Sequence, residues 1–233
     1  YLSISPYAYC NNNPLKYIDP DGRKIVLTGD DVDNGYKQIQ ESTTILLIKD
    51  DSGNLSYDAN SLPENLTLAD KTLIEAINAD DILVHLICTK NSVVNGEKWF
   101  AGGGFWGNSI IDGITTAIQY LNPSIMEKLS DFLDMDNGVG ALHEILEAYL
   151  CAKGNPNTNE NDEEIYKTYH EAAKVLDPRH KDCAYGAELL PIPDAKNVWF
   201  NIFVEKKNES GNLESRVIDP LCSIPSSTKN GKR

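Results

Sequence analysis

The sequence predicts an α+β fold, with a twisted mixed or antiparallel sheet and helices in the N-terminal part and a mainly helical second half. Two patterns support this prediction. Short β-prone runs bounded by turn residues dominate before Pro123, and apolar residues at helical spacing dominate after it. The chain has 233 residues, of which 41% are hydrophobic and 24% are charged, an ordinary balance for a globular chain long enough to bury a core.

Local signals define each expected element of the N-terminal part. Turn formers separate the β-prone runs, and Asp31 and Thr67 precede apolar residues at helical spacing, which indicates helix starts. A polar, glycine-containing turn over residues 51–54 predicts a hairpin. We expect strands over residues 24–27, 43–49, 55–57 and 82–89, and helices after residue 31 and over residues 67–78.

Helices dominate the expected second half. One amphipathic helix starts at Pro123, a second ends at Lys153, and a third ends before Pro178. A cationic last turn followed by glycine, as at Lys153, is a usual helix end. After these helices, two β-prone runs flank a turn at Gly211. We expect helices over residues 123–132, from after residue 137 to 153, and over 163–176, and strands over 197–205 and 214–218.

Charge and cysteine content exclude several classes of protein. With 21 Lys and Arg against 35 Asp and Glu, the formal net charge is −14, so no broad basic face is available to bind nucleic acid. The five cysteines form no CxxC pair, which argues against a disulfide framework or a thiolate metal cluster. The longest apolar runs are far shorter than the roughly 20 residues of a membrane-spanning helix. No signal peptide is visible, and we expect a piece of a longer chain without a membrane span.

One expected helix carries residues suited to metal chemistry. In the helix that ends at Lys153, His143 and Glu147 are four positions apart and share a face, while Glu144 projects about 100° away. This is the spacing of the HExxH zinc helix with glutamate in the second ligand position. A zinc hydrolase site needs about three protein ligands, and His170 in the following helix is the natural third. We therefore expect Zn²⁺ held by His143, Glu147 and His170, with Glu144 as the general base that activates the attacking water.

Alternatives remain open around this site. His-Glu pairs also occur on solvated helices, but the neighbours of His143 are mostly apolar, and buried carboxylates are costly without a compensating cation. His180 or Asp177 replaces His170 as a ligand or supports it from outside the ligand shell, unless both only form a helix-end turn. Tyr149 and Tyr185 are alternative donors to a developing oxyanion, and His85 is an alternative ligand, but packing is the favoured interpretation for all three side chains.

The N-terminal segment resembles the end of a known repeat-protein core. Residues 5–22 read SPYAYCNNNPLKYIDPDG, in which Tyr, Asn-Pro and Asp-Pro-x-Gly elements occur in order. This resembles the last repeat of Rhs (YD-repeat) proteins, which precedes a variable C-terminal domain. The resemblance implies that residues 1–23 are the end of an Rhs core and that residues 24–233 are a toxin or effector domain, secreted or delivered at the cell surface. It also implies self-cleavage near Asp19, Pro20 and Gly22.

The His-Glu motif carries a second resemblance. The sequence from His143 to Tyr149, followed by Tyr-x-x-x-His ending at His170, is similar to zincin-like metallopeptidase domains at the C-termini of Rhs-type polymorphic toxins. The resemblance implies a zincin-like fold over residues 24–233, a protein or peptide substrate, a cognate immunity protein and contact with the remainder of the Rhs shell. Glutamate in place of the usual second histidine leaves two rival hypotheses: a catalytically inactive zincin-like binding module, and a toxin with another hydrolytic activity.

Residues 99–108 have two interpretations. In zincins a strand beside the metal helix pairs with the extended substrate, and the glycines at 102–104 would allow a peptide backbone to approach closely. The alternative is a bulged hairpin whose aromatic residues belong to the core.

Overall fold

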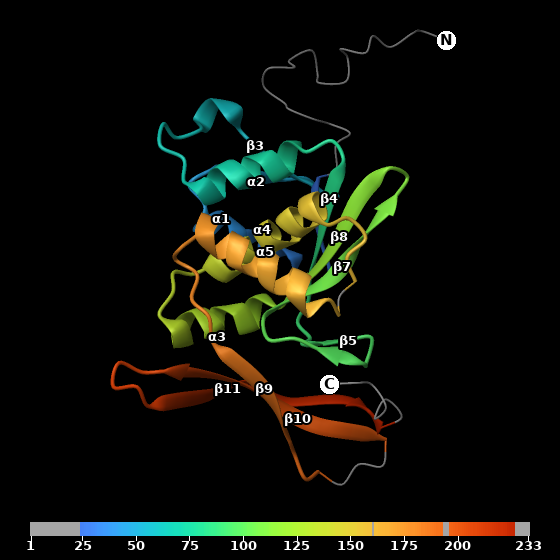
Figure 1. Cartoon of the computed structure of the whole chain (residues 1–233), viewed down its shortest axis with the longest axis vertical. Coiled ribbons are helices and arrows are strands. Elements are labelled where there is room, and N and C mark those ends of the chain that lie inside the picture. Colours follow the sequence, from blue (N-terminus) through green and yellow to red (C-terminus); the bar gives the residue numbers. More distant parts are fainter. Residues whose placement is uncertain (1–23, 160, 193–195, 227–233) are drawn as a thin grey trace.

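The computed structural model describes residues 24–159, 161–192 and 196–226 (Figure 1). These residues form a larger sheet with helices packed against it and a second, antiparallel sheet at one end of the molecule. The predicted α+β class is confirmed. The expected Rhs-like segment, residues 1–23 with Asp19, Pro20 and Gly22, lies outside the described residues.

A mixed four-stranded sheet forms the centre of the main body, in the order β1-β4-β8-β7. Strands β1 (Ile25–Thr28), β4 (Ile82–Cys88) and β8 (Ile114–Leu121) are parallel, and β7 (Gly103–Ile111) lies antiparallel to β8 at the edge. Buried and partly exposed side chains alternate along β4, because successive strand residues point to opposite faces. The sheet is mixed, one of the two forms that the sequence left open, and its edge next to β8 is an antiparallel strand.

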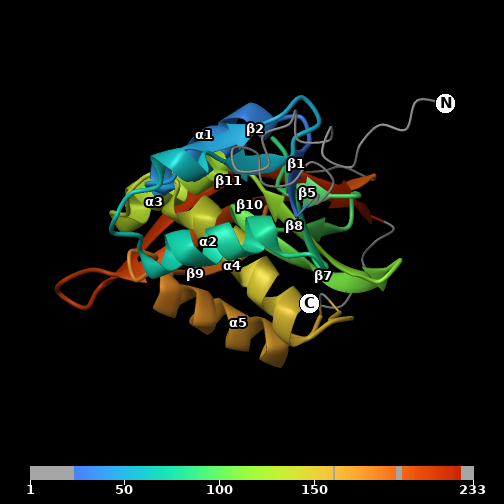
Figure 2. The same cartoon turned by 90° about the horizontal axis from the view of Figure 1, so that it is seen from above.

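Helix α4 (Val139–Gly154) lies across one face of this sheet and is the most enclosed helix of the molecule. It contacts strands β4, β7 and β8 on one side and the other α-helices on its remaining sides, as Figure 2 shows from above. A helix enclosed in this way is expected to be apolar all round, and apart from its His-Glu motif α4 is. The surrounding helices are α1 (Val32–Ser42), α2 (Leu68–Asn78), α3 (Pro123–Leu133) and α5 (Glu163–Leu176).

A separate antiparallel sheet follows the helices and contacts α3 and the hairpin before β7. It consists of β9 (Ala184–Leu189), β10 (Asn197–Lys207) and β11 (Leu213–Pro225), in the order β11-β10-β9 (Figure 1). The last predicted helix ends at Leu176 as expected, and the strands predicted after it, over 197–205 and 214–218, are present as β10 and β11 but are longer. Strand β9 was not expected, because it is exposed at nearly every position and lacks apolar alternation.

The predicted strand over residues 43–49 is shorter in the structure. The hydroxyl groups of Thr43 and Thr44 donate to the carboxylate of Asp70 in the first turn of α2, which holds both threonines outside the strand. Thr67 and Asp70 form a capping box at the start of α2, in agreement with the predicted helix start. The remaining short elements are β2 (Leu47–Lys49) paired with β3 (Leu55–Tyr57), η2 (Ala59–Ser61), and β5 (Val93–Val94) paired with β6 (Lys98–Trp99).

Strands β7 and β8 form a bulged hairpin, which was one of the two interpretations of residues 99–108. The pairing shifts register between Phe105 and Asn108, and the turn residues Asp112 and Gly113 have φ of 51° and 83°, as a tight hairpin turn requires. The N–H of Asn108 donates to Thr158 O at 2.9 Å, so the loop after α4 covers part of the outer edge of β7.

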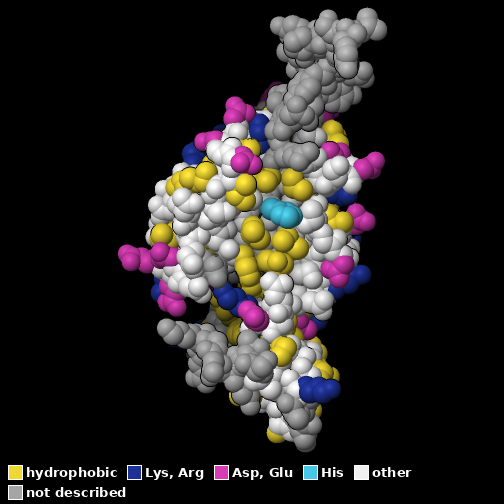
Figure 3. Space-filling model, turned by 90° about the vertical axis from the view of Figure 1, so that its right-hand side faces the viewer, with side chains coloured by type: hydrophobic (Ala, Val, Ile, Leu, Met, Phe, Trp, Pro, Cys, Tyr) yellow, Lys and Arg dark blue, Asp and Glu magenta, His cyan; other side chains and the backbone are white. Residues whose placement is uncertain are grey.

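The second face of the four-stranded sheet is turned away from the helices. Among the described helices, α1 and α4 contact the sheet, and both lie on the face that carries Cys88. Figure 3 shows the side of the molecule that lies on the right in Figure 1, where hydrophobic side chains gather around a histidine. On the second face of the sheet, His85 is half-buried and its Nε2 lies 2.8 Å from Thr28 Oγ1. No helix of the described part is long and apolar enough to cross a membrane.

Candidate metal centre

Helix α4 places His143 and Glu147 one turn apart on the same buried face, as their spacing predicts. His143 has no exposed surface, Glu147 is 2% exposed, and His143 Nε2 lies 3.4 Å from Glu147 Oε2. Because the neighbouring residues of α4 are apolar, these polar groups are costly to bury without further partners. The partners come from elements that follow α4 in the chain.

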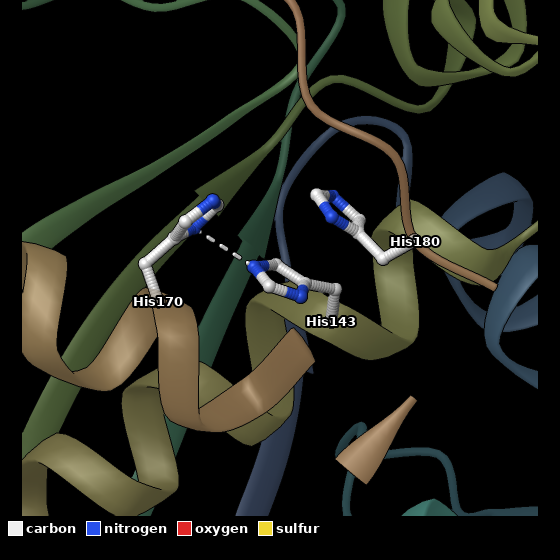
Figure 4. A group of neighbouring side chains, drawn as sticks. All are labelled: His143, His170 and His180. Atoms are coloured by element: carbon white, nitrogen blue, oxygen red, sulfur yellow. Dashed lines mark hydrogen bonds between the residues drawn. The ribbon is translucent and has the colours of Figure 1, made fainter. Parts of the chain in front are cut away.

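Helix α5 supplies the first partner. It packs against α4 and directs His170 at the pair. His170 Nδ1 lies 2.9 Å from His143 Nε2 (Figure 4), and it also lies 2.9 Å from Glu147 Oε2. Ligands at about 2.0–2.1 Å from a tetrahedral zinc ion lie about 3.3 Å apart, so these three atoms form a triangle only slightly smaller than a zinc ligand set. The structure thus brings together the three residues that the sequence predicted as ligands.

A third histidine enters from the loop that follows α5. The ring of His180 stacks on the ring of His143, with centroids 3.7 Å apart and planes inclined by 14° (Figure 4). One ligand nitrogen from each of His143, His170 and His180 lies within 4.8 Å of the others. These three histidines are therefore close enough to bind one metal ion.

His180 and Asp177, the two alternatives to His170, have different places in the structure. Asp177 is 2% exposed and accepts hydrogen bonds of 2.7 and 2.8 Å from the guanidinium group of Arg179. Arg179 also donates to Ser42 O at 2.9 Å, which anchors the loop to the end of α1. His180 thus belongs to the cluster, whereas Asp177 anchors the loop that carries it.

Glu144 lies beside the cluster, between α4 and the sheet. Gln119 of β8 is fully buried and donates from Nε2 to Glu144 Oε2. Gly103 of β7 packs so closely that a Cβ atom there would lie 2.0 Å from Glu144 Cδ. Burial and the charge of Glu147 raise the pKa of Glu144 well above its usual value. A glutamate with a raised pKa next to a metal-ligand cluster is suited to act as a general base.

The ionisable groups of the cluster differ in charge. Burial raises the pKa of Glu147, but hydrogen bonds from His143 and His170 outweigh it and lower that pKa. Burial lowers the pKa of His170, but interactions with Glu147 and Asp182 outweigh it and raise that pKa to about 9. Burial and the neighbouring His143 and His170 lower the pKa of His180 to about 3. Glu147 and His170 therefore form an ion pair, and His180 is neutral with a lone pair available to a cation.

The donor set fits a zinc ion. Three buried atoms of the cluster, His143 Nδ1, Glu147 Oε1 and His180 Nδ1, have no hydrogen-bond partner in the described part of the chain. Imidazole nitrogen and carboxylate oxygen are donors that zinc takes in proteins, and a divalent cation would compensate the carboxylates that α4 buries.

Two residues of the site, Gln119 and Asp182, were not predicted as part of it, and Tyr166 appeared only as the tyrosine of the Tyr-x-x-x-His motif. Gln119 contacts Glu144 from β8, and Asp182 Oδ1 lies 3.1 Å from His170 Nε2. The ring of Tyr166 stacks against that of His170, with centroids 5.5 Å apart and planes inclined by 22°. Of these three contacts, only that of Tyr166 can be predicted from local spacing, because Tyr166 lies one helical turn before His170. The other two residues approach the cluster from elements that no periodicity connects with it.

The two tyrosines considered as oxyanion donors lie in different surroundings. Burial and the nearby Glu75 raise the pKa of Tyr149, whose hydroxyl group interacts with that glutamate. Desolvation by neighbouring atoms and the charges of Glu144 and Glu147 raise the pKa of Tyr185. Its side chain on β9 is nevertheless 58% exposed, so the expectation of a buried packing role is wrong for Tyr185. Of the two, Tyr185 is the tyrosine influenced by the candidate centre.

Comparison of the chain with protein-family models, with curated proteins and with solved structures gives no match. The resemblance to the Rhs core and to zincin-like metallopeptidases rests on the sequence motifs, and it remains a prediction. The geometry of the histidine cluster therefore carries the argument about function.

Proposed function

We propose that this chain is a zinc-dependent peptidase that acts as the C-terminal toxin or effector domain of a secreted Rhs-type protein. The observation that carries the proposal is the convergence of His143 Nε2, Glu147 Oε2 and His170 Nδ1, with Glu144 on the same helix. The Rhs-like motif in residues 5–22 supports the assignment to a delivered effector.

His143, Glu147 and His170 would hold the zinc ion, which when bound lowers the pKa of water and polarises a carbonyl group. Glu144 accepts a proton from the attacking water and returns it to the leaving amine. Gln119 occupies Glu144 Oε2, so the other carboxylate oxygen is free for the proton transfer.

The edge of β7 supports a peptide as the substrate. Among the described residues, the hydrogen bonds that cover this edge begin at Asn108, which donates to Thr158 O. The preceding residues, 104–107, lie next to the general base, because Gly103 contacts the Glu144 carboxylate. An extended peptide paired with this segment would bring one of its carbonyl groups close to the cluster.

Metal content and proteolysis test the proposal together. Protein purified without chelator is expected to contain about one zinc ion per chain and to cleave an unfolded protein such as reduced casein. Glu144→Gln is expected to retain zinc and to lose about 10²–10⁴-fold in activity, the usual contribution of a general base. Glu127→Gln, on the exposed side of α3, is the matched control and should behave like the wild type. Absence of stoichiometric zinc, or undiminished cleavage by Glu144→Gln, would contradict the proposal.

His180 favours a second candidate, a catalytically inactive metal-binding module. Its ligand nitrogen lies within 4.8 Å of those of His143 and His170, so it offers a fourth donor beside Glu147. Four protein donors are typical of structural zinc sites, whereas catalytic sites keep one position open. Acetohydroxamate separates the two candidates, because it needs an open position on the metal. A change in the visible spectrum of the cobalt-substituted protein supports the peptidase; an unchanged spectrum without proteolysis supports the module.

A further inference from the structure

Asp182 lies just outside the histidine cluster and contacts two of its members. Its Oδ1 is 3.1 Å from His170 Nε2 and 3.6 Å from His180 Nδ1. Its Oδ2 accepts a hydrogen bond from Lys174, which lies one turn after His170 on α5. Lys174 therefore holds the carboxylate against the edge of the His170 ring that faces away from Glu147.

The two nitrogens of His170 have different partners. Nδ1 faces His143 Nε2 and Glu147 Oε2, whereas Nε2 faces the carboxylate of Asp182. A neutral imidazole carries a single proton, and an ionised carboxylate can accept a hydrogen bond but cannot donate one. In the ion pair with Glu147 both nitrogens of His170 carry a proton, and a metal ion would displace one of them. The proton that remains on Nε2 binds Asp182, which leaves the lone pair on Nδ1, the atom directed into the cluster.

We propose that Asp182 is a positioning residue, which holds the His170 ring and its tautomer so that Nδ1 is the metal-binding atom. This inference rests on the proposed metal site and goes beyond it, because the ligand set alone does not decide which nitrogen of His170 binds. Carboxylates that orient ligating histidines contribute about 10–100-fold to metal affinity. Because the Asp182 side chain is 46% exposed, water competes for its hydrogen bond with His170. We therefore expect the contribution of Asp182 to metal affinity to lie at the lower end of that range.

An ordinary surface ion pair is the competing explanation for Asp182. Lys174 also binds Glu171, whose Oε1 lies 3.0 Å from the ammonium group. If Asp182 only neutralises Lys174, then its replacement should have the same small effect as replacement of Glu171. Glu171→Gln is therefore a matched control that removes a carboxylate from the same lysine.

The zinc affinity of the full chain, measured by competition with a chelator, separates these explanations. Asp182→Ala is expected to weaken zinc binding by at least about tenfold, and Glu171→Gln by less than about twofold. Asp182→Asn should fall between them, because its amide oxygen can still accept the Nε2 proton. Asp182→Asn also keeps the size of the side chain, so it provides the test if Asp182→Ala does not fold.

Nitrogen NMR of the zinc-loaded chain gives a readout that a purely structural role would not change. In the wild type, His170 is expected to show a protonated Nε2 and a metal-bound Nδ1, and in Asp182→Ala the Nε2 proton signal should broaden by exchange with water. Zinc bound through Nε2 in the wild type would overturn the inference, as would an Asp182→Ala variant that matches Glu171→Gln in affinity and spectrum. A wild-type chain that binds no zinc overturns the proposed function itself, so the two failures are distinguishable.

Discussion

The carboxylate of Glu144 has room beside the cluster only because residue 103 is glycine. Gly103 leaves no side chain on β7, and a Cβ atom there would lie 2.0 Å from Glu144 Cδ. Gln119 of the neighbouring strand binds the same carboxylate. Two strands therefore confine the general base, and a catalytic group must be held within about 0.5 Å of its productive position.

Gly103→Ala is expected to lower peptidase activity by at least about tenfold, because displacement of a catalytic group by about 1 Å has effects of this size or larger. Zinc content should not change, since the three atoms nearest to the added methyl group all belong to Glu144. Activity and zinc content of the purified variant check this. The control is Ser109→Ala at an exposed position of the same strand, where the backbone does not have a positive φ. Full activity or loss of zinc in Gly103→Ala would refute the expectation.

Hydrogen bonds to a single carboxylate connect helix α2 with the segment before β2. Asp70 is 2% exposed and accepts hydrogen bonds from the backbone N–H of Thr67 and the hydroxyl groups of Thr43 and Thr44. Burial raises the pKa of Asp70, but these hydrogen bonds outweigh it and lower that pKa below its usual value of 3.8. The start of this helix is thus stabilised by an ionised, buried side chain.

Asp70→Ala is expected to lower the free energy of unfolding by about 1–3 kcal/mol at neutral pH, because it removes the cap and leaves buried donors without an acceptor. Because the folded-state pKa is depressed, the contribution of Asp70 is complete above about pH 4 and is lost as the pH falls through that pKa. Urea unfolding at several pH values measures the free energy of unfolding of both proteins, and the difference between wild type and Asp70→Ala should become smaller below about pH 4. If the difference in free energy of unfolding does not depend on pH, Asp70 does not stabilise the fold as an ionised group. The control is Asp51→Ala, which removes an aspartate from an exposed turn.

The metal cluster joins parts of the chain that meet only in the folded molecule. Helix α4 is enclosed by the sheet and the other helices, so the cluster exists only when these elements have packed. Metal binding to such a site is coupled to folding of the whole main body. The contributing residues are His143 and Glu147 on α4, His170 on α5, and His180 and Asp182 in the loop before β9.

Zinc at about one hundred times its dissociation constant is expected to raise the free energy of unfolding by about 2.7 kcal/mol. For a domain of this size, this corresponds to a rise in Tm of about 5–10 °C. Thermal unfolding with zinc and with EDTA measures the shift. Mg²⁺ should produce none, because it prefers oxygen ligands, and His143→Ala should abolish the shift. A Tm that is the same with zinc and with EDTA would speak against a metal centre.

Prediction from the sequence succeeded where the signal is local. The bounds of the described helices follow from apolar spacing and capping residues, and the shared face of His143 and Glu147 follows from a separation of four positions. Prediction failed for β9, which is exposed along almost its whole length, and it missed Asp182 and Gln119 as neighbours of the site. Burial patterns and helical spacing carry no information about such contacts.

By itself, the sequence determined the α+β class, the helices, and the His-Glu face of α4, because each depends on residues within a few positions of one another. Only the tertiary structure decided that His180 and Asp182 join His170, and that Gln119 meets Glu144. These contacts link positions as far apart as His143 and His170, or Gln119 and Glu144. The physical reason is that their distances are set by the packing of α4 between α5 and the sheet, and no local pattern encodes that packing.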